Sequence, residues 1–259
     1  MQQVRKVQGV GFHANFWSNV EMDLDTGLFV ERKQLLPTSN SLYHMCDPQW
    51  MADHLEDDLA LQLAAYSGGV IQELHREKVT KLAARLSFSF DWDLLSRRDT
   101  VPNLVPGLPA MTRMQAHAAA LLDKYSLRAT QFILDKVCSF ASQNDRELLL
   151  VLFDHSRAMP EMRLRGTRYD REIVDYLLAK RVTFFDMNDI HLLDFQKYNL
   201  NWEDYMKQYF IGHYNPAGNG FFAYSIKDKV ASWLDPKPVP YQNPNQQSVN
   251  FGGYIKGYQ

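Results

Sequence analysis

The segment from Leu148 to Met187 decides the fold class of this chain. It opens with LLLVLF (148–153) and closes with VTFFDM (182–187), two short apolar runs rich in β-branched and aromatic residues. Such runs are typical of strands buried on both faces of a parallel sheet. Between them, YDREIVDYLLAK (169–180) places four apolar residues on one face of a helix: Ile173, Val174, Leu177 and Leu178. The sequence therefore predicts a strand–helix–strand unit of the α/β class.

The pattern extends outward from this unit in both directions. VQGVGF (7–12) reads as another buried strand, and an amphipathic helix is expected over 221–234, where Pro236 ends it. We expect a single α/β domain over 1–235, built as a three-layer αβα sandwich around a parallel sheet. The last residues, 236–259, are expected to form an extended arm because they contain few core-forming side chains.

A long stretch separates the first two predicted strands. We interpret residues 19–109 as a mainly helical insertion, helical from 48 to 86 with a break at Ser67-Gly68-Gly69, followed by a loop over 97–111. Two further helices are expected over 111–125 and 129–142.

Composition excludes several classes of protein. The 259 residues carry 28 Lys and Arg against 30 Asp and Glu, a net charge of −2 that offers no general attraction to nucleic acid or anionic membrane. The longest apolar runs fall short of the ~20 residues of a membrane span, and the first residues lack the apolar core of a signal peptide. We therefore expect a soluble, cytoplasmic protein. Cys46 and Cys138 have no spacing that indicates a zinc site or a disulfide framework.

Polar residues follow each predicted strand, where ligands of open parallel sheets bind. They are His13 and Asn15, then Asp154, His155 and Arg157, then Asn188, Asp189 and His191. A structural role competes with each: the histidines could be exposed or structural, and Asp154 and Asp189 could cap helices. Arginines near this edge, at 157, 163, 165 and 168, could hold a phosphate or face solvent. The histidine spacing predicts no metal site, and no cofactor motif or glycine-rich phosphate loop is present.

One stretch near the end of the chain is the most informative about function. FIGHYNPAGNG (210–220) places His213 directly before residues that let the backbone turn tightly into the last helix. An imidazole held on a rigid turn suits proton transfer, because its pKa of ~6.5 lets it accept and return a proton near neutral pH. A structural histidine in a glycine-rich turn is the alternative.

GHYNPAGNGFFAYSI (212–226) resembles the last conserved block of the SGNH (GDSL-type) hydrolase family, with His213 followed by Asn215, Pro216 and Gly218. The resemblance implies a flavodoxin-like sheet, ester hydrolysis or O-acyl transfer, and His213 as general base. VQGVGFHANFWSN (7–19) resembles the family's Gly-x-Asn block, which makes Asn15 the oxyanion donor. The substrate-contacting positions would be Gly11, His13, Asp154 and Asn215.

Two parts of the family pattern are absent from this sequence. No Gly-Asp-Ser or GxSxG occurs, and no serine follows a strand in the required context; the serines weighed are Ser18, Ser41, Ser67, Ser156 and Ser225. The family's Asp before the histidine is replaced by Phe210 and Ile211. The imidazole would then have to be oriented from farther away, by Asp204, Glu203 or Asp194, or by a backbone carbonyl.

The missing serine motif suggests that the chain is the C-terminal portion of a longer SGNH-type protein, with an incomplete sheet. Strand 7–12 would then have a bare apolar edge, covered by a missing N-terminal segment or by a partner chain. We expect poor solubility or partner-dependent folding of the isolated chain.

Two functions remain open on the sequence. The first is an SGNH-type ester hydrolase or O-acyl transferase, acting on a small-molecule ester or, given the Trp and Tyr residues near the site, an acetylated glycan. The second is a non-catalytic α/β binding or scaffold protein. A phosphate-handling enzyme that uses the arginine cluster is a weaker third.

Overall fold

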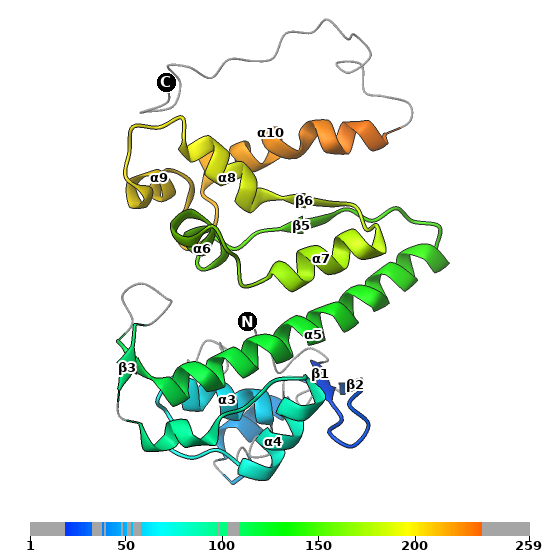
Figure 1. Ribbon diagram of the computed structural model, residues 1–259. Coiled ribbons are helices and arrows are strands. Elements are labelled where there is room, and N and C mark those ends of the chain that lie inside the picture. Colours follow the sequence, from blue (N-terminus) through cyan, green and yellow to red (C-terminus); the bar gives the residue numbers. More distant parts are fainter. Residues whose placement is uncertain are drawn as a thin grey trace, which may run out of the picture. The chain divides into compact units, whose positions relative to one another are not determined.

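The computed structural model describes residues 19–32, 38, 40–47, 49–50, 53, 58–97, 99–102 and 109–234. The chain divides into two compact units, residues 1–146 and 147–259 (Figure 1). The domain predicted over 1–235 spans both units, and the predicted insertion at 19–109 lies within the first.

The first unit surrounds one long helix, α5 (Arg113–Gln143), against which α3 (Leu59–Ser67) packs. Helix α4 (Arg76–Arg85) contributes Val79 and Leu82 to the same core, which also contains Leu63, Ala118 and Leu121. An antiparallel hairpin of β1 (Asn19–Met22) and β2 (Phe29–Arg32) joins this core through Met22, whose amide donates to the Tyr125 hydroxyl. Short elements complete the unit: η2 (Asn40–Cys46), η3 (Trp92–Ser96), β3 (Thr100–Val101) and β4 (Met111–Thr112).

The first unit corrects one expectation. Two helices were predicted over 111–125 and 129–142, but residues 113–143 form the single helix α5, and Met111 and Thr112 belong to β4. It begins at a capping box, in which the Thr112 hydroxyl accepts from the Gln115 amide and the Gln115 side chain accepts from the Thr112 amide. No glycine or proline lies between the two predicted runs, so nothing interrupts the backbone hydrogen bonds there. The break at Ser67-Gly68-Gly69 is confirmed, because α3 ends at Ser67.

The second unit contains the predicted strand–helix–strand arrangement. Strand β5 (Leu150–Leu152) pairs in parallel with β6 (Phe184–Asp186), in a register that sets Val151 opposite Phe185. The crossover between the strands carries two helices, α6 (Ala158–Arg165) and α7 (Arg171–Lys180). Helix α7 buries Ile173, Val174 and Leu177, three of the four residues of its predicted apolar face, and leaves Leu178 exposed.

Three helices follow β6: α8 (Met187–Phe195), α9 (Trp202–Tyr209) and α10 (Pro216–Trp233). Helices α6, α8 and α9 and the start of α10 gather at the end of the sheet where β5 finishes (Figure 1). Helix α10 begins at Pro216, five residues before the start expected from the sequence, because Asn215 caps it.

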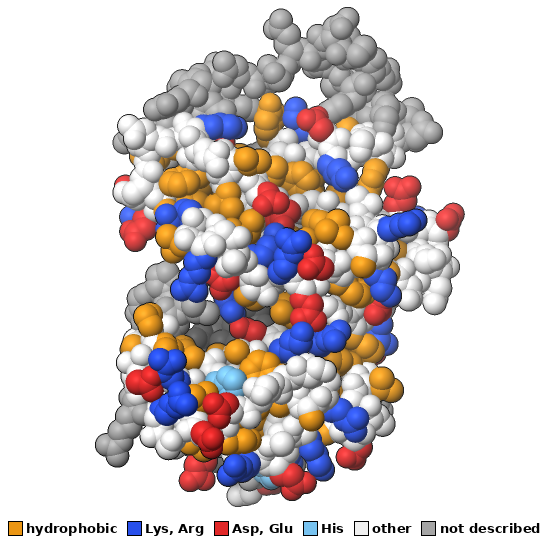
Figure 2. All heavy atoms as spheres, viewed as in Figure 1, with side chains coloured by type: hydrophobic (Ala, Val, Ile, Leu, Met, Phe, Trp, Pro, Cys, Tyr) orange, Lys and Arg blue, Asp and Glu red, His pale blue; other side chains and the backbone are white. Residues whose placement is uncertain are grey.

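The described residues therefore form a mixed α/β structure that is mainly helical, with three two-stranded sheets. The expected strand 7–12 and the expected arm 236–259 lie outside the described residues. Within the described part of the chain, no helix is both long and apolar enough to cross a membrane. Basic and acidic side chains intermingle over the face shown in Figure 2, in keeping with the near-neutral net charge.

Candidate functional site at the carboxyl end of the β5–β6 sheet

The turn that carries His213 is held by backbone hydrogen bonds. Phe210 and Tyr214 form an isolated antiparallel bridge, and the Ile211 amide donates to the His213 carbonyl at 2.9 Å. Gly212 has φ = 95°, a left-handed conformation that costs glycine little and other residues much more. These hydrogen bonds and the Gly212 conformation therefore fix the backbone that carries His213.

The hydrogen bond of the His213 ring fixes its tautomer. Nδ1 lies 2.8 Å from the carbonyl oxygen of Tyr214, and the residue is exposed. A carbonyl oxygen can only accept, so Nδ1 carries the proton and Nε2 carries the lone pair. A backbone carbonyl therefore holds the imidazole in the tautomer that a general base requires.

Helix α10 starts directly behind this turn on a fixed support. The Asn215 side chain accepts from the Gly218 amide at 2.9 Å and donates to the Gln208 carbonyl at 2.8 Å, so it caps α10 and ties it to α9. Gly218 is buried, and a Cβ there would collide with the Tyr214 ring and the Tyr209 carbonyl. The glycine is therefore needed because the helix start and the turn approach each other closely.

The turn packs on the residues that leave β5. The Phe153 ring stacks on Phe210 with centroids 5.4 Å apart and on Tyr214 at 4.8 Å. His155 stacks on Phe210 at 4.7 Å, and its burial lowers the pKa of the imidazole although Asp154 opposes this. These contacts place the His213 turn at the carboxyl end of β5, where parallel sheets bind their ligands.

Asp154, the first polar residue after β5, is buried and surrounded by donors. One carboxylate oxygen accepts from the amides of Ser156 and Arg157 and from the Ser156 hydroxyl, and the other accepts from the Tyr169 hydroxyl at 2.8 Å. Burial alone would raise the pKa of Asp154, but these hydrogen bonds outweigh it and hold the pKa below its usual value. Its carboxylate organises the turn that leads into α6.

A buried ion-pair group joins the crossover to the end of β6. Arg168 contacts Asp170 at 2.6 Å and also binds Asp186, and all three side chains are at most 13% exposed. Asp186 in turn accepts from the Asn188 amide and caps α8. The Asn188 side chain accepts from the Asp154 amide at 2.8 Å, which links the two strand ends.

A second histidine, His191, lies fully buried behind the turn. Its Nδ1 is 2.9 Å from the Tyr205 hydroxyl and its Nε2 is 2.7 Å from the Tyr214 hydroxyl. The Tyr205 and Tyr209 hydroxyls both contact Oδ2 of Asp194, at 3.2 and 3.1 Å. A chain of hydrogen bonds therefore runs from Tyr214, beside His213, through His191 and Tyr205 to Asp194.

This chain of hydrogen bonds is consistent with two distributions of protons. With Asp194 ionised, Tyr205 donates to Asp194, His191 donates from Nδ1, and Tyr214 donates to Nε2. With Asp194 protonated, every one of these bonds can reverse. Burial lowers the pKa of His191 to about 4 and raises the pKa of Asp194, although Lys197 opposes the latter shift. The imidazole is thus neutral near pH 7 and serves to position Tyr214.

The structure brings some of the residues singled out from the sequence together and not others. His155, His191 and the His213 turn meet around Phe210. Asp204 lies in the first turn of α9, where its contacts are with Asn201 and Lys207. Gly11, His13 and Asn15 lie outside the described residues.

The serines weighed as nucleophiles have other roles where the structure describes them. The hydroxyls of Ser41, Ser67 and Ser156 bond to Thr38, Ala64 and Asp154. Ser225 lies on α10 in the wall of a pocket, and Ser18 is outside the described residues. Within the described ranges, no group of three or more His, Cys, Asp or Glu side chains is arranged to hold a metal ion.

The hydrogen-bonded chain was missed from the sequence, although its spacing was visible there. His191 and Asp194 are three residues apart, and Tyr205 and Tyr209 are four apart, so each pair shares one face of a helix. That these four side chains are buried follows from the structure and not from the spacing.

Comparison of the chain with protein-family models, with curated proteins and with solved structures found no match.

Proposed function

We propose that the second unit is the C-terminal portion of an SGNH-type α/β hydrolase fold that acts on carboxylic esters, by hydrolysis or by O-acyl transfer. The observation that carries the proposal is the His213 ring, exposed on a fixed turn at the carboxyl end of β5 with its Nδ1 proton held by the Tyr214 carbonyl. This leaves Nε2 as a base toward solvent.

The finer architecture is part of the same proposal. Two parallel strands alone expose much of their surface, and Val151 of β5 is 40% exposed. We propose that the β5–β6 pair belongs to a parallel, flavodoxin-like sheet with helices on both faces.

The proposed chemistry uses His213 twice. As a serine oxygen attacks the ester carbonyl carbon, Nε2 takes the hydroxyl proton and then returns it to the alkoxide that leaves as an alcohol. Water or an acceptor hydroxyl then repeats the sequence on the acyl-enzyme and regenerates the serine. The Asn15 amide would stabilise the oxyanion of each tetrahedral intermediate. The serine would come from another segment or a partner chain.

A non-catalytic binding or scaffold role is the second candidate. It is favoured by one observation: among the described residues, none of the serine hydroxyls with a described hydrogen bond is bonded to His213. The two candidates make opposite predictions about ester turnover.

Ester turnover by the chain, alone and extended by the residues encoded immediately upstream, tests the proposal. We expect release of nitrophenol from a short-chain nitrophenyl ester by the extended form, and a fall of about 100-fold in kcat/KM on His213→Ala, because the general base is lost. His44→Ala, which removes an exposed histidine of the first unit, is the matched control and should leave the rate unchanged.

Turnover in neither form would support the scaffold role instead. Turnover that survives His213→Ala undiminished would show that this residue is not the base.

A further inference from the structure

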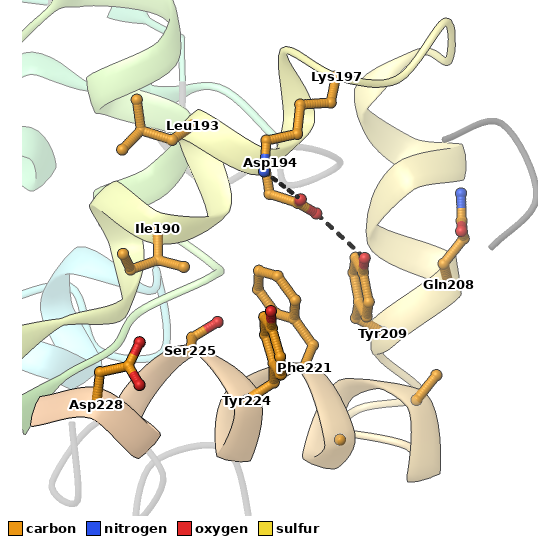
Figure 3. A pocket seen from close by; sticks show the side chains of 12 residues that line it. Ile190, Leu193, Asp194, Lys197, Gln208, Tyr209, Phe221, Tyr224, Ser225 and Asp228 are labelled. Atoms are coloured by element: carbon orange, nitrogen blue, oxygen red, sulfur yellow. Dashed lines mark hydrogen bonds and ion pairs between the residues drawn. The ribbon is translucent and has the colours of Figure 1, made fainter. Parts of the chain in front are cut away.

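A pocket of about 590 Å³ lies between α8, α9 and α10 of the second unit. Helix α8 supplies Ile190 and Leu193, α9 supplies Tyr209, and α10 supplies Phe221 and Tyr224 (Figure 3). Its volume and its mainly apolar walls with a few polar groups are typical of small-molecule sites.

The polar end of the pocket is the carboxylate of Asp194, which is 5% exposed. Figure 3 shows this side chain reaching from α8 toward Tyr209. Oδ2 accepts from the Tyr205 and Tyr209 hydroxyls, whereas Oδ1 has the Lys197 ammonium at 3.5 Å. A strong bond between an ammonium and a carboxylate is shorter, at about 2.7–2.9 Å, so Oδ1 retains capacity to accept.

The walls are suited to a cation as well as to an apolar body. Tyr209 and Phe221 lie with ring centroids 4.9 Å apart and supply aromatic surface to the pocket, whereas the Tyr224 ring already has the Lys227 ammonium 4.2 Å from its centroid. Aromatic faces attract ammonium groups by cation–π interaction.

We propose that this pocket binds an amphipathic amine, with its aromatic or aliphatic body between Phe221 and Leu193 and its protonated ammonium directed at Oδ1 of Asp194. The Lys197 side chain is 52% exposed, so the ligand ammonium can replace it while lysine moves into solvent. A carboxylate ligand would instead bring a second negative charge against Asp194. Amine binding in this pocket is independent of ester hydrolysis.

Calorimetric titration of the full chain with three matched compounds tests the inference: 2-phenylethylamine, 2-phenylethanol and 3-phenylpropanoate. We expect the amine to bind most tightly and Asp194→Asn to weaken it about tenfold or more, because a charge-assisted hydrogen bond is lost. Binding of the alcohol should change little. Lys197→Met should strengthen amine binding, because it removes the competing cation, and this variant keeps Asp194 and its tyrosine contacts intact.

Asp228→Asn is the matched control. Asp228 also lines the pocket, but its side chain is 74% exposed and lies 3.9 Å from Lys227, so this variant removes the same charge at the rim with little expected effect. Equal binding of the three compounds, tightest binding of the carboxylate, or no binding at millimolar concentration would each overturn the inference.

Discussion

Replacement of Arg168 by methionine is expected to lower the free energy of unfolding of the second unit by about 3–5 kcal/mol, because it leaves two buried carboxylates without a neutralising cation. The guanidinium contacts Asp170 and Asp186, whose side chains are 13% and 7% exposed, and these contacts raise its pKa against the effect of burial. The loss should appear in urea unfolding followed by hydrogen exchange of peptides that cover β5 and β6.

Arg171→Met supplies the matched control for this prediction. Arg171 pairs with Asp175 at 2.8 Å, but the two side chains are 68% and 55% exposed, so the cost should stay below about 1 kcal/mol. Adding Asp170→Asn and Asp186→Asn to Arg168→Met should recover part of the lost stability, because the unpaired charges are then gone. Equal losses for the two arginines would contradict the buried pairing.

Acidification is expected to cost the second unit about 3 kcal/mol between pH 6.5 and pH 4 through His191 alone, because one pKa unit corresponds to ~1.4 kcal/mol. Burial holds the folded pKa near 4, whereas the unfolded imidazole titrates near 6.5. The unfolded chain therefore binds the proton first as the pH falls, so the stability present above pH 6.5 is lost toward pH 4. His155 acts in the same direction.

Asp194 opposes this trend, because burial raises its pKa and its protonation favours the folded state. The comparison that isolates His191 is the slope of stability against pH in His191→Gln, which should be much shallower than in the unaltered chain. His44→Gln is the control for the substitution itself, because it lies in the first unit and should leave the unfolding of the second unit unaltered. A slope that His191→Gln does not alter would show that the buried imidazole is not the group that titrates.

The strands β5 and β6 and the helix α7 could be predicted, because each is marked by an apolar pattern within its own residues. Runs 148–153 and 182–187 became β5 and β6, paired in parallel, and the apolar stripe 173–178 became the buried face of α7. Helix α5 was predicted as two helices, although the residues between the two runs, Ser126, Leu127 and Arg128, include no helix breaker.

The site was predictable only in part. Gly212 and Pro216, on either side of His213, predicted a tight turn into a helix, and the structure has that turn. The contacts that hold this turn at the end of the sheet join residues that are distant in the sequence, such as Phe153 with Tyr214 and His191 with Tyr205. Such pairings depend on how the helices and the turn pack in three dimensions, which no local pattern encodes.

The central claim is that the His213 turn lies at the carboxyl end of β5, against the residues that follow this strand. Cysteines introduced at His155 and His213, with Cys46 and Cys138 replaced by serine, can be joined by a short bifunctional maleimide and detected by mass spectrometry. The pair His155→Cys and Lys180→Cys is the control, because Lys180 precedes β6 at the opposite end of the sheet. The account predicts rapid intramolecular linking of 155 with 213 and little of 155 with 180; linking of the control pair alone, or of neither pair, would contradict it.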